Sequence, residues 1–144
     1  MNNVEIIDLK NILPIKDSWM FYKTDNAQIV DWTINSDIIL RIILPDEVLE
    51  WFVEIYNSHK IKLIDEWYEV YGKKSIELLQ MELKKEIEGF CKNIADNETR
   101  FTSYRRGIFL YKKFQSFDTN TSSWKDVIIK KEIKLFIACR ASGA

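Results

Sequence analysis

The stretch from Pro45 to Gly72, PDEVLEWFVEIYNSHKIKLIDEWYEVYG, constrains the fold most, because it combines regular apolar spacing with two tryptophans and many carboxylates. Its apolar residues recur at intervals of three and four, the spacing of one helix face. They are Val48, Trp51, Phe52 and Ile55, followed by Ile61, Ile64, Trp67, Tyr68 and Tyr71. Pro45 suits a first helical turn and Gly72 a C-terminal cap, so the stretch predicts a helical hairpin or one kinked helix.

The rest of the chain predicts further helices. Ser75 can cap a helix whose apolar stripe runs through Ile76, Leu79, Leu83, Ile87, Phe90 and Ile94. Two more are expected, over residues 97–117 and from Ser123 onward. The isoleucine-rich run 38–44 fits either a helix or a strand. We therefore predict a mainly α protein, a compact bundle of about five to six helices. A short β hairpin or an extended arm in the first 35 residues stays open, and an α+β fold is the alternative.

Length and composition indicate one soluble domain. The 144 residues match a single globular domain spanning residues 1–144, and 13% aromatics with only 4 Gly and 2 Pro favour a compact core. Met1 to Lys10 shows no secretory signal, and no apolar run approaches the roughly 20 residues of a membrane span. Cys91 and Cys139 have no partner at metal-binding spacing, which predicts buried thiols in a reducing, cytoplasmic environment.

Several kinds of chemistry lack the residues they need. The single histidine, His59, lies in the polar break Asn57-Ser58-His59-Lys60, where a solvated turn is expected rather than a catalytic base. The four glycines stand apart from one another, so no phosphate-binding loop or dinucleotide fingerprint is present. The sequence therefore predicts a protein that is not an enzyme, with no catalytic residue, metal site or cofactor.

Charge is distributed unevenly along the chain. Residues 25–70 hold 10 acidic and 3 basic residues, a net charge of -7, whereas residues 91–144 hold 11 basic and 5 acidic residues, a net charge of +6. Such asymmetry suggests a charged interaction surface. Tryptophan among carboxylates is typical of an interface centre with a charged rim. The predicted partner-binding residues are Asp46, Glu47, Glu50, Glu54, Asp65, Glu66, Glu69 and Trp67.

A second candidate surface lies in RFTSYRRGIFLYKKF, residues 100–114, which has 5 basic and 5 aromatic residues. Basic side chains interleaved with aromatic rings can bind phosphates and stack bases. The helical interpretation turns Phe101, Tyr104, Ile108 and Tyr111 into the core and leaves the basic residues outside. The alternative function is therefore a nucleic-acid-associated accessory or regulatory protein. Its predicted binding residues are Arg105, Arg106, Lys112 and Lys113.

In general character the chain resembles the bacterial immunity proteins of contact-dependent growth inhibition and other polymorphic toxin systems. The resemblance rests on size, on an Asn/Ile/Lys-rich composition, and on the segments DEVLEWFVE and DEWYE. It implies a protein-binding inhibitor that neutralises a cognate toxin, many such toxins being nucleases. The acidic residues would then cover the basic substrate groove of the toxin, with no membrane partner.

Overall fold

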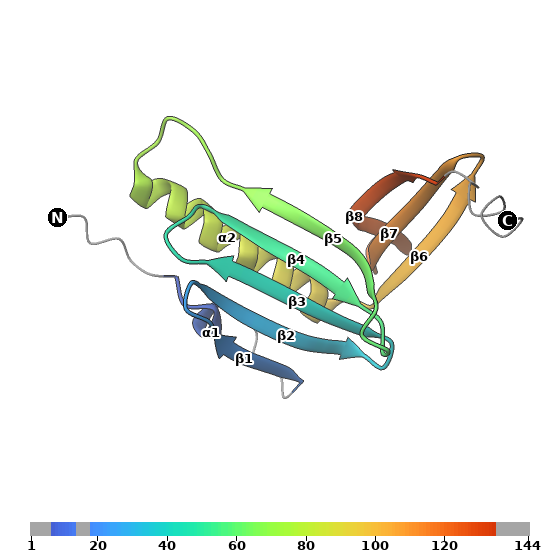
Figure 1. The fold of residues 1–144 in the computed structure, drawn as a ribbon, viewed down its shortest axis with the longest axis horizontal. Helices are drawn as coiled ribbons and strands as arrows, with labels where there is room; N and C mark the ends of the chain where they lie inside the picture. The colour runs from blue at the N-terminus through green and yellow to red at the C-terminus, as the bar shows by residue number, and fades with distance from the viewer. Residues whose placement is uncertain (1–6, 14–17, 135–144) are drawn as a thin grey trace, which may run out of the picture.

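A computed structural model describes residues 7–13 and 18–134 and shows a mainly β protein (Figure 1). Two antiparallel sheets of five and three strands are joined by one long helix. The elements are α1 (Leu9–Ile12), β1 (Trp19–Lys23), β2 (Ala27–Asn35), β3 (Ile38–Pro45), β4 (Glu50–Tyr56), β5 (Lys62–Glu69), α2 (Ile76–Asp96), β6 (Thr99–Arg106), β7 (Phe109–Asp118) and β8 (Ser123–Ile133). The prediction of a mainly α helical bundle is therefore wrong.

The predicted helical hairpin at Pro45 to Gly72 is instead the β4–β5 hairpin. Along β4 burial alternates strictly: Trp51, Val53 and Ile55 are fully buried and the residues between them are partly exposed. A period of two is the signature of a strand with one buried face. Aromatic and β-branched residues pack well on a pleated surface, and here that preference prevails over an apolar spacing that also fits a helix.

The five-stranded sheet is a meander in the order β1-β2-β3-β4-β5. Its first hairpin, β1 with β2, shows that the hairpin rather than the extended arm, both left open for the first 35 residues, is formed, and it is the edge of a larger sheet. In β3 the isoleucine-rich run alternates, with Ile38, Leu40, Ile42 and Leu44 buried. Antiparallel neighbours in register place all inward side chains on one face of the sheet, so this face forms the core.

Helix α2 covers that face and lies behind the sheet in Figure 1. The prediction of this helix is confirmed, including the Ser75 cap, whose hydroxyl accepts a hydrogen bond from the Leu78 backbone amide. The stripe that it buries consists of Leu79, Leu83, Ile87, Cys91 and Ile94. The short helix α1 joins the same core through Leu9, whose amide donates to the buried Gln28 side chain at 2.9 Å. Neither helix is long and apolar enough to cross a membrane within the part of the chain described.

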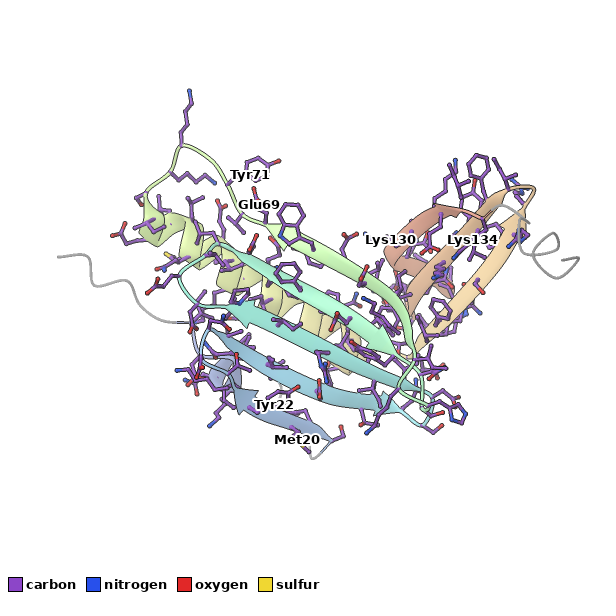
Figure 2. All side chains as sticks on the ribbon, in the orientation of Figure 1. Met20, Tyr22, Glu69, Tyr71, Lys130 and Lys134 are labelled. Atoms are coloured by element: carbon purple, nitrogen blue, oxygen red, sulfur yellow. The ribbon has the colours of Figure 1, made fainter. Side chains whose placement is uncertain are left out.

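The helices predicted over residues 97–117 and from Ser123 are the strands of the second sheet, in the order β6-β7-β8. This sheet lies beyond β5 at one end of the molecule (Figure 1). One of its faces packs onto the common core through Phe114 and Ile128, both buried. Across the boundary, Lys130 of β8 donates a hydrogen bond to Glu66 of β5 at 3.0 Å. The labelled Lys130 in Figure 2 points toward β5.

Cys91 confirms the expectation of a buried thiol, and burial raises its pKa from 9.0 to about 12. Cys139 lies outside the described residues. Because folding raises this pKa, the folded chain keeps a proton that the unfolded chain loses. The stability contributed by this group is therefore present below pH 9 and is lost as the pH rises above that value.

A Cys139→Ser variant isolates the behaviour of Cys91. We expect its remaining thiol to react with a chromogenic disulfide reagent at pH 8 only through the unfolded fraction of the protein, because the thiolate is the reactive form and is absent from the core. Adding urea should accelerate the reaction in proportion to the unfolded fraction. Complete reaction in native buffer within the mixing time would contradict the buried position of Cys91.

Candidate functional site on the open face of the five-stranded sheet

One face of the five-stranded sheet packs against α2, and no helix or strand within residues 7–13 and 18–134 covers the other face. Strand alternation places on it the side chains that point away from α2, including Met20 and Tyr22 of β1 (Figure 2). On β4 and β5 this open face carries Glu50, Phe52, Glu54, Asp65, Trp67 and Glu69. We call these six residues the acidic face. Five of the eight predicted partner-binding residues lie together on it.

The register of β4 and β5 pairs the residues of the acidic face directly across the strands. Glu50 is opposite Glu69, Phe52 is opposite Trp67, and Glu54 is opposite Asp65. Trp67 is 52% exposed, and its indole NH donates to a Glu50 carboxylate oxygen at 2.9 Å. This hydrogen bond orients a large aromatic ring on the surface instead of leaving it free to rotate.

The two pairs of carboxylates on this face differ in how they are neutralised. Lys62 lies 3.0 Å from Asp65 and 3.8 Å from Glu54, so one cation serves both members of that pair. For Glu50 and Glu69 no ion pair is found among the described residues. Like charges directly opposite each other on neighbouring strands are destabilising. The end of the face around Trp67 therefore has excess negative charge.

The β1–β3 part of the open face is electrically balanced. Arg41 binds Asp31 with two hydrogen bonds, at 2.7 and 3.0 Å, and the Tyr22 hydroxyl donates to the same carboxylate at 3.3 Å. Burial and the nearby Asp31 raise the pKa of Tyr22. Beside them, Tyr56 donates to Glu54 at 2.9 Å, and burial and this hydrogen bond raise its pKa. This network fixes the centre of the face and adds no net charge.

Three of the predicted partner-binding residues lie elsewhere. Glu66 is on the opposite side of β5, where it pairs with Lys130 at 3.0 Å. Asp46 and Glu47 are exposed in the turn between β3 and β4, next to the Glu50 end of the acidic face. Trp51, the other tryptophan of the acidic stretch, is fully buried. Both the omission of Phe52 and the inclusion of Glu66 follow from assuming a helix where the chain forms strands.

The four predicted nucleic-acid-binding residues are also divided between two faces. Arg106 and Lys113 point away from the core on the second sheet. Arg105 and Lys112 are on the face that includes Phe114, and Lys112 pairs with Glu132 at 3.1 Å. Alternation along a strand separates neighbouring residues, so the pairs Arg105-Arg106 and Lys112-Lys113 do not act as single patches.

No family model, curated protein or solved structure matches this chain.

The chemistry of the open face thus follows from its own residues. Within the part of the chain that the structure describes, no three potential metal ligands lie together. His59 is exposed in the β4–β5 turn, and its amide donates to the Asn57 side chain at 2.9 Å. What the face offers is a rigid, half-exposed aromatic centre with a negatively charged border.

Proposed function

We propose that this protein is a protein-binding inhibitor, an immunity protein that neutralises a cognate bacterial toxin in the cytoplasm. In this proposal the acidic face covers the basic substrate groove of the toxin, most simply that of a nuclease. The single observation that supports it best is the Glu50–Glu69 pair, two carboxylates in direct register beside a half-exposed tryptophan. Two carboxylates that repel each other in this way would be stabilised if a partner placed a positive charge beside them, which would explain why the surface keeps both.

The geometry suggests how such a complex would divide its binding energy. Trp67 and Phe52, in register, would fill an apolar depression at the centre, where aromatic residues contribute most to affinity. Glu50 and Glu69 would pair with lysine or arginine side chains around it. Charge complementarity of this kind raises association rates to about 10⁸ M⁻¹s⁻¹ or more at low salt, which matters for an inhibitor that competes with the toxin's substrate.

Arg41 and Lys62 would stay with their own carboxylates in this complex. The two hydrogen bonds from Arg41 to Asp31 neutralise that carboxylate within the sheet. Glu66 is likewise engaged, by Lys130, and contributes no contact. The exposed turn that contains Asp46 and Glu47 extends the negative charge beyond Glu50, toward the border of the partner.

The product of the adjacent upstream gene is the natural partner to test. We expect the tagged protein, co-expressed with that product, to purify as a stoichiometric complex with nanomolar affinity, and to abolish the product's toxicity in the cytoplasm. The proposal fails if the product is a folded, active toxin domain and no nanomolar binding is detected. If a Trp67→Ala variant of unchanged stability no longer inhibits the toxin, the inhibition depends on the acidic face.

A further inference from the structure

The second sheet has an outer face whose residues are very different from those of the acidic face. Phe101, Phe114 and Ile128 on the inner face pack against the core, so alternate residues on the three strands point the other way. Those outer residues include Arg100, Tyr104 and Arg106 of β6, Phe109, Tyr111 and Lys113 of β7, and Lys131 of β8. We call these seven residues the aromatic-cationic face. They correct the prediction that the tyrosines of this segment belong to the core.

Two tyrosines form the centre of the aromatic-cationic face. Tyr104 and Tyr111 are directly opposite each other across β6 and β7, and their rings stack at 4.9 Å with an interplanar angle of 12°. Phe109 extends the cluster, 6.5 Å from Tyr111. Tyr104 is 44% exposed, and Ile133, opposite Phe109, is 65% exposed. An exposed apolar cluster of this kind on a small protein often marks a binding site.

Cations surround these rings. The Lys131 ammonium lies 4.0 Å from the centre of the Phe109 ring and 5.7 Å from that of Tyr111, and Lys113 lies 5.7 Å from the Tyr104 ring centre. Farther along the face, the Arg100 guanidinium lies over the Trp124 ring at 4.1 Å. Of its four cations, Lys113 pairs with the Asp126 carboxylate at 3.6 Å. For Arg100, Arg106 and Lys131 no ion pair is found among residues 18–134. The face therefore has net positive charge.

Lysines that lie above exposed aromatic rings allow one face to bind both the phosphates and the bases of a ligand. Each lysine can swing from a ring to a phosphate, and the exposed ring then becomes available for stacking. Phe117, which is opposite Trp124, lies six positions after Tyr111 on β7, so the aromatic positions extend over about 20 Å of strand. That length accommodates several nucleotides of an extended strand. A duplex would present phosphates to the lysines but would keep its bases stacked inside.

We propose that the aromatic-cationic face binds single-stranded nucleic acid, with bases stacked on Tyr104 and Tyr111 and phosphates held by Lys113, Lys131 and Arg106. Charge complementarity fits either ligand, but stacking favours nucleic acid over an acidic protein, because an acidic protein would use the cations and leave the tyrosine pair without a role. The inference is independent of the proposed inhibitor function, because it concerns another sheet and a ligand of opposite charge.

Fluorescence anisotropy with labelled dT12 and U12, using the full-length protein, tests this inference. We expect binding that weakens with salt, and about 5- to 100-fold weaker binding for Tyr104→Ala. Tyr104→Phe, which keeps the ring, should bind within about twofold of the wild type. Tyr104→Leu keeps apolar bulk on the strand and should bind as poorly as Tyr104→Ala, which separates lost stacking from a damaged fold.

Two charge variants complete the test. Lys131→Gln should weaken binding and reduce the salt dependence by about 0.7 per lost phosphate contact. Lys112→Gln, the matched control on the inner face, should leave both unchanged. The inference is overturned if neither oligonucleotide binds, if Tyr104→Leu binds as well as the wild type, or if polyaspartate of equal charge binds as tightly as dT12. The last result would indicate a site for acidic proteins instead.

Discussion

Replacing Trp51 by alanine should lower the free energy of unfolding by about 3–5 kcal/mol, because it removes a large side chain from a packed core. The Trp51 side chain is fully buried. Its ring stacks on Tyr68 at 4.6 Å and meets Phe90 of α2 edge-on at 5.3 Å, so it joins β4, β5 and the helix. Its indole NH also donates to Glu86 at 3.1 Å. Urea denaturation followed by circular dichroism measures the loss.

Trp67→Ala is the matched control for that substitution, since the two tryptophans lie on opposite faces of neighbouring strands. Trp67 is 52% exposed, and its side chain makes one hydrogen bond, from the indole NH to Glu50, so its removal should change the free energy of unfolding by less than about 1 kcal/mol. Similar losses for both variants would contradict the assignment of Trp51 to the core and of Trp67 to the surface.

The Glu69→Lys substitution should make the protein more stable while weakening the proposed binding of a basic partner. A lysine at this position would face Glu50 directly across the strands and would replace a repulsion with an attraction. We expect the free energy of unfolding to rise by about 0.2–1 kcal/mol, measured at low ionic strength. The same change removes one of the two unneutralised carboxylates beside Trp67. A loss of stability would contradict the pairing of Glu50 with Glu69.

The fold could be predicted from the sequence only where one periodicity stood alone. Helix α2 has a cap at Ser75 and an apolar stripe at helical spacing, with no competing alternation, and it was predicted correctly. In β4 the same residues satisfy two periods. Trp51 and Ile55 are four positions apart, which suits a helix, and together with Val53 they occupy every second position, which suits a strand. Cross-strand partners distant in sequence decide between the two, and a single segment does not reveal them.

The polar break at residues 57–60 is the part of the sequence that distinguishes a β hairpin from a helical hairpin. In the structure the Asn57 side chain accepts hydrogen bonds from the amides of His59 and Ile61, and Lys60 has a φ of 62°. A side chain that binds the backbone two residues later is typical of a tight turn between strands. Recognised as a hairpin turn, this break would have predicted the β4–β5 pair and, through alternation, its two faces.

The acidic face was partly predictable because charge counts do not depend on secondary structure. Glu50 and Glu54 are four residues apart, as are Asp65 and Glu69, and this spacing shares one face in a helix and also in a strand. Glu66 and Asp65 are adjacent, which separates them in a strand, and the structure places Glu66 on the opposite side. Tyr104 was misassigned to the core because it is three residues from Phe101, a spacing that shares one face of a helix but places the two side chains on opposite faces of a strand.

The association rate with the product of the upstream gene tests the proposed function most directly. Wild type, Glu69→Lys and Glu88→Lys should be compared by stopped-flow mixing over a range of ionic strength. Glu88 is exposed on α2, on the covered side of the sheet, so its reversal changes the net charge equally without touching the acidic face. We predict that Glu69→Lys associates about tenfold or more slowly at low salt, that the difference shrinks as salt screens the charges, and that Glu88→Lys stays close to wild type. An unchanged rate for Glu69→Lys at low salt, or equal slowing of both variants, would contradict a role for the acidic face.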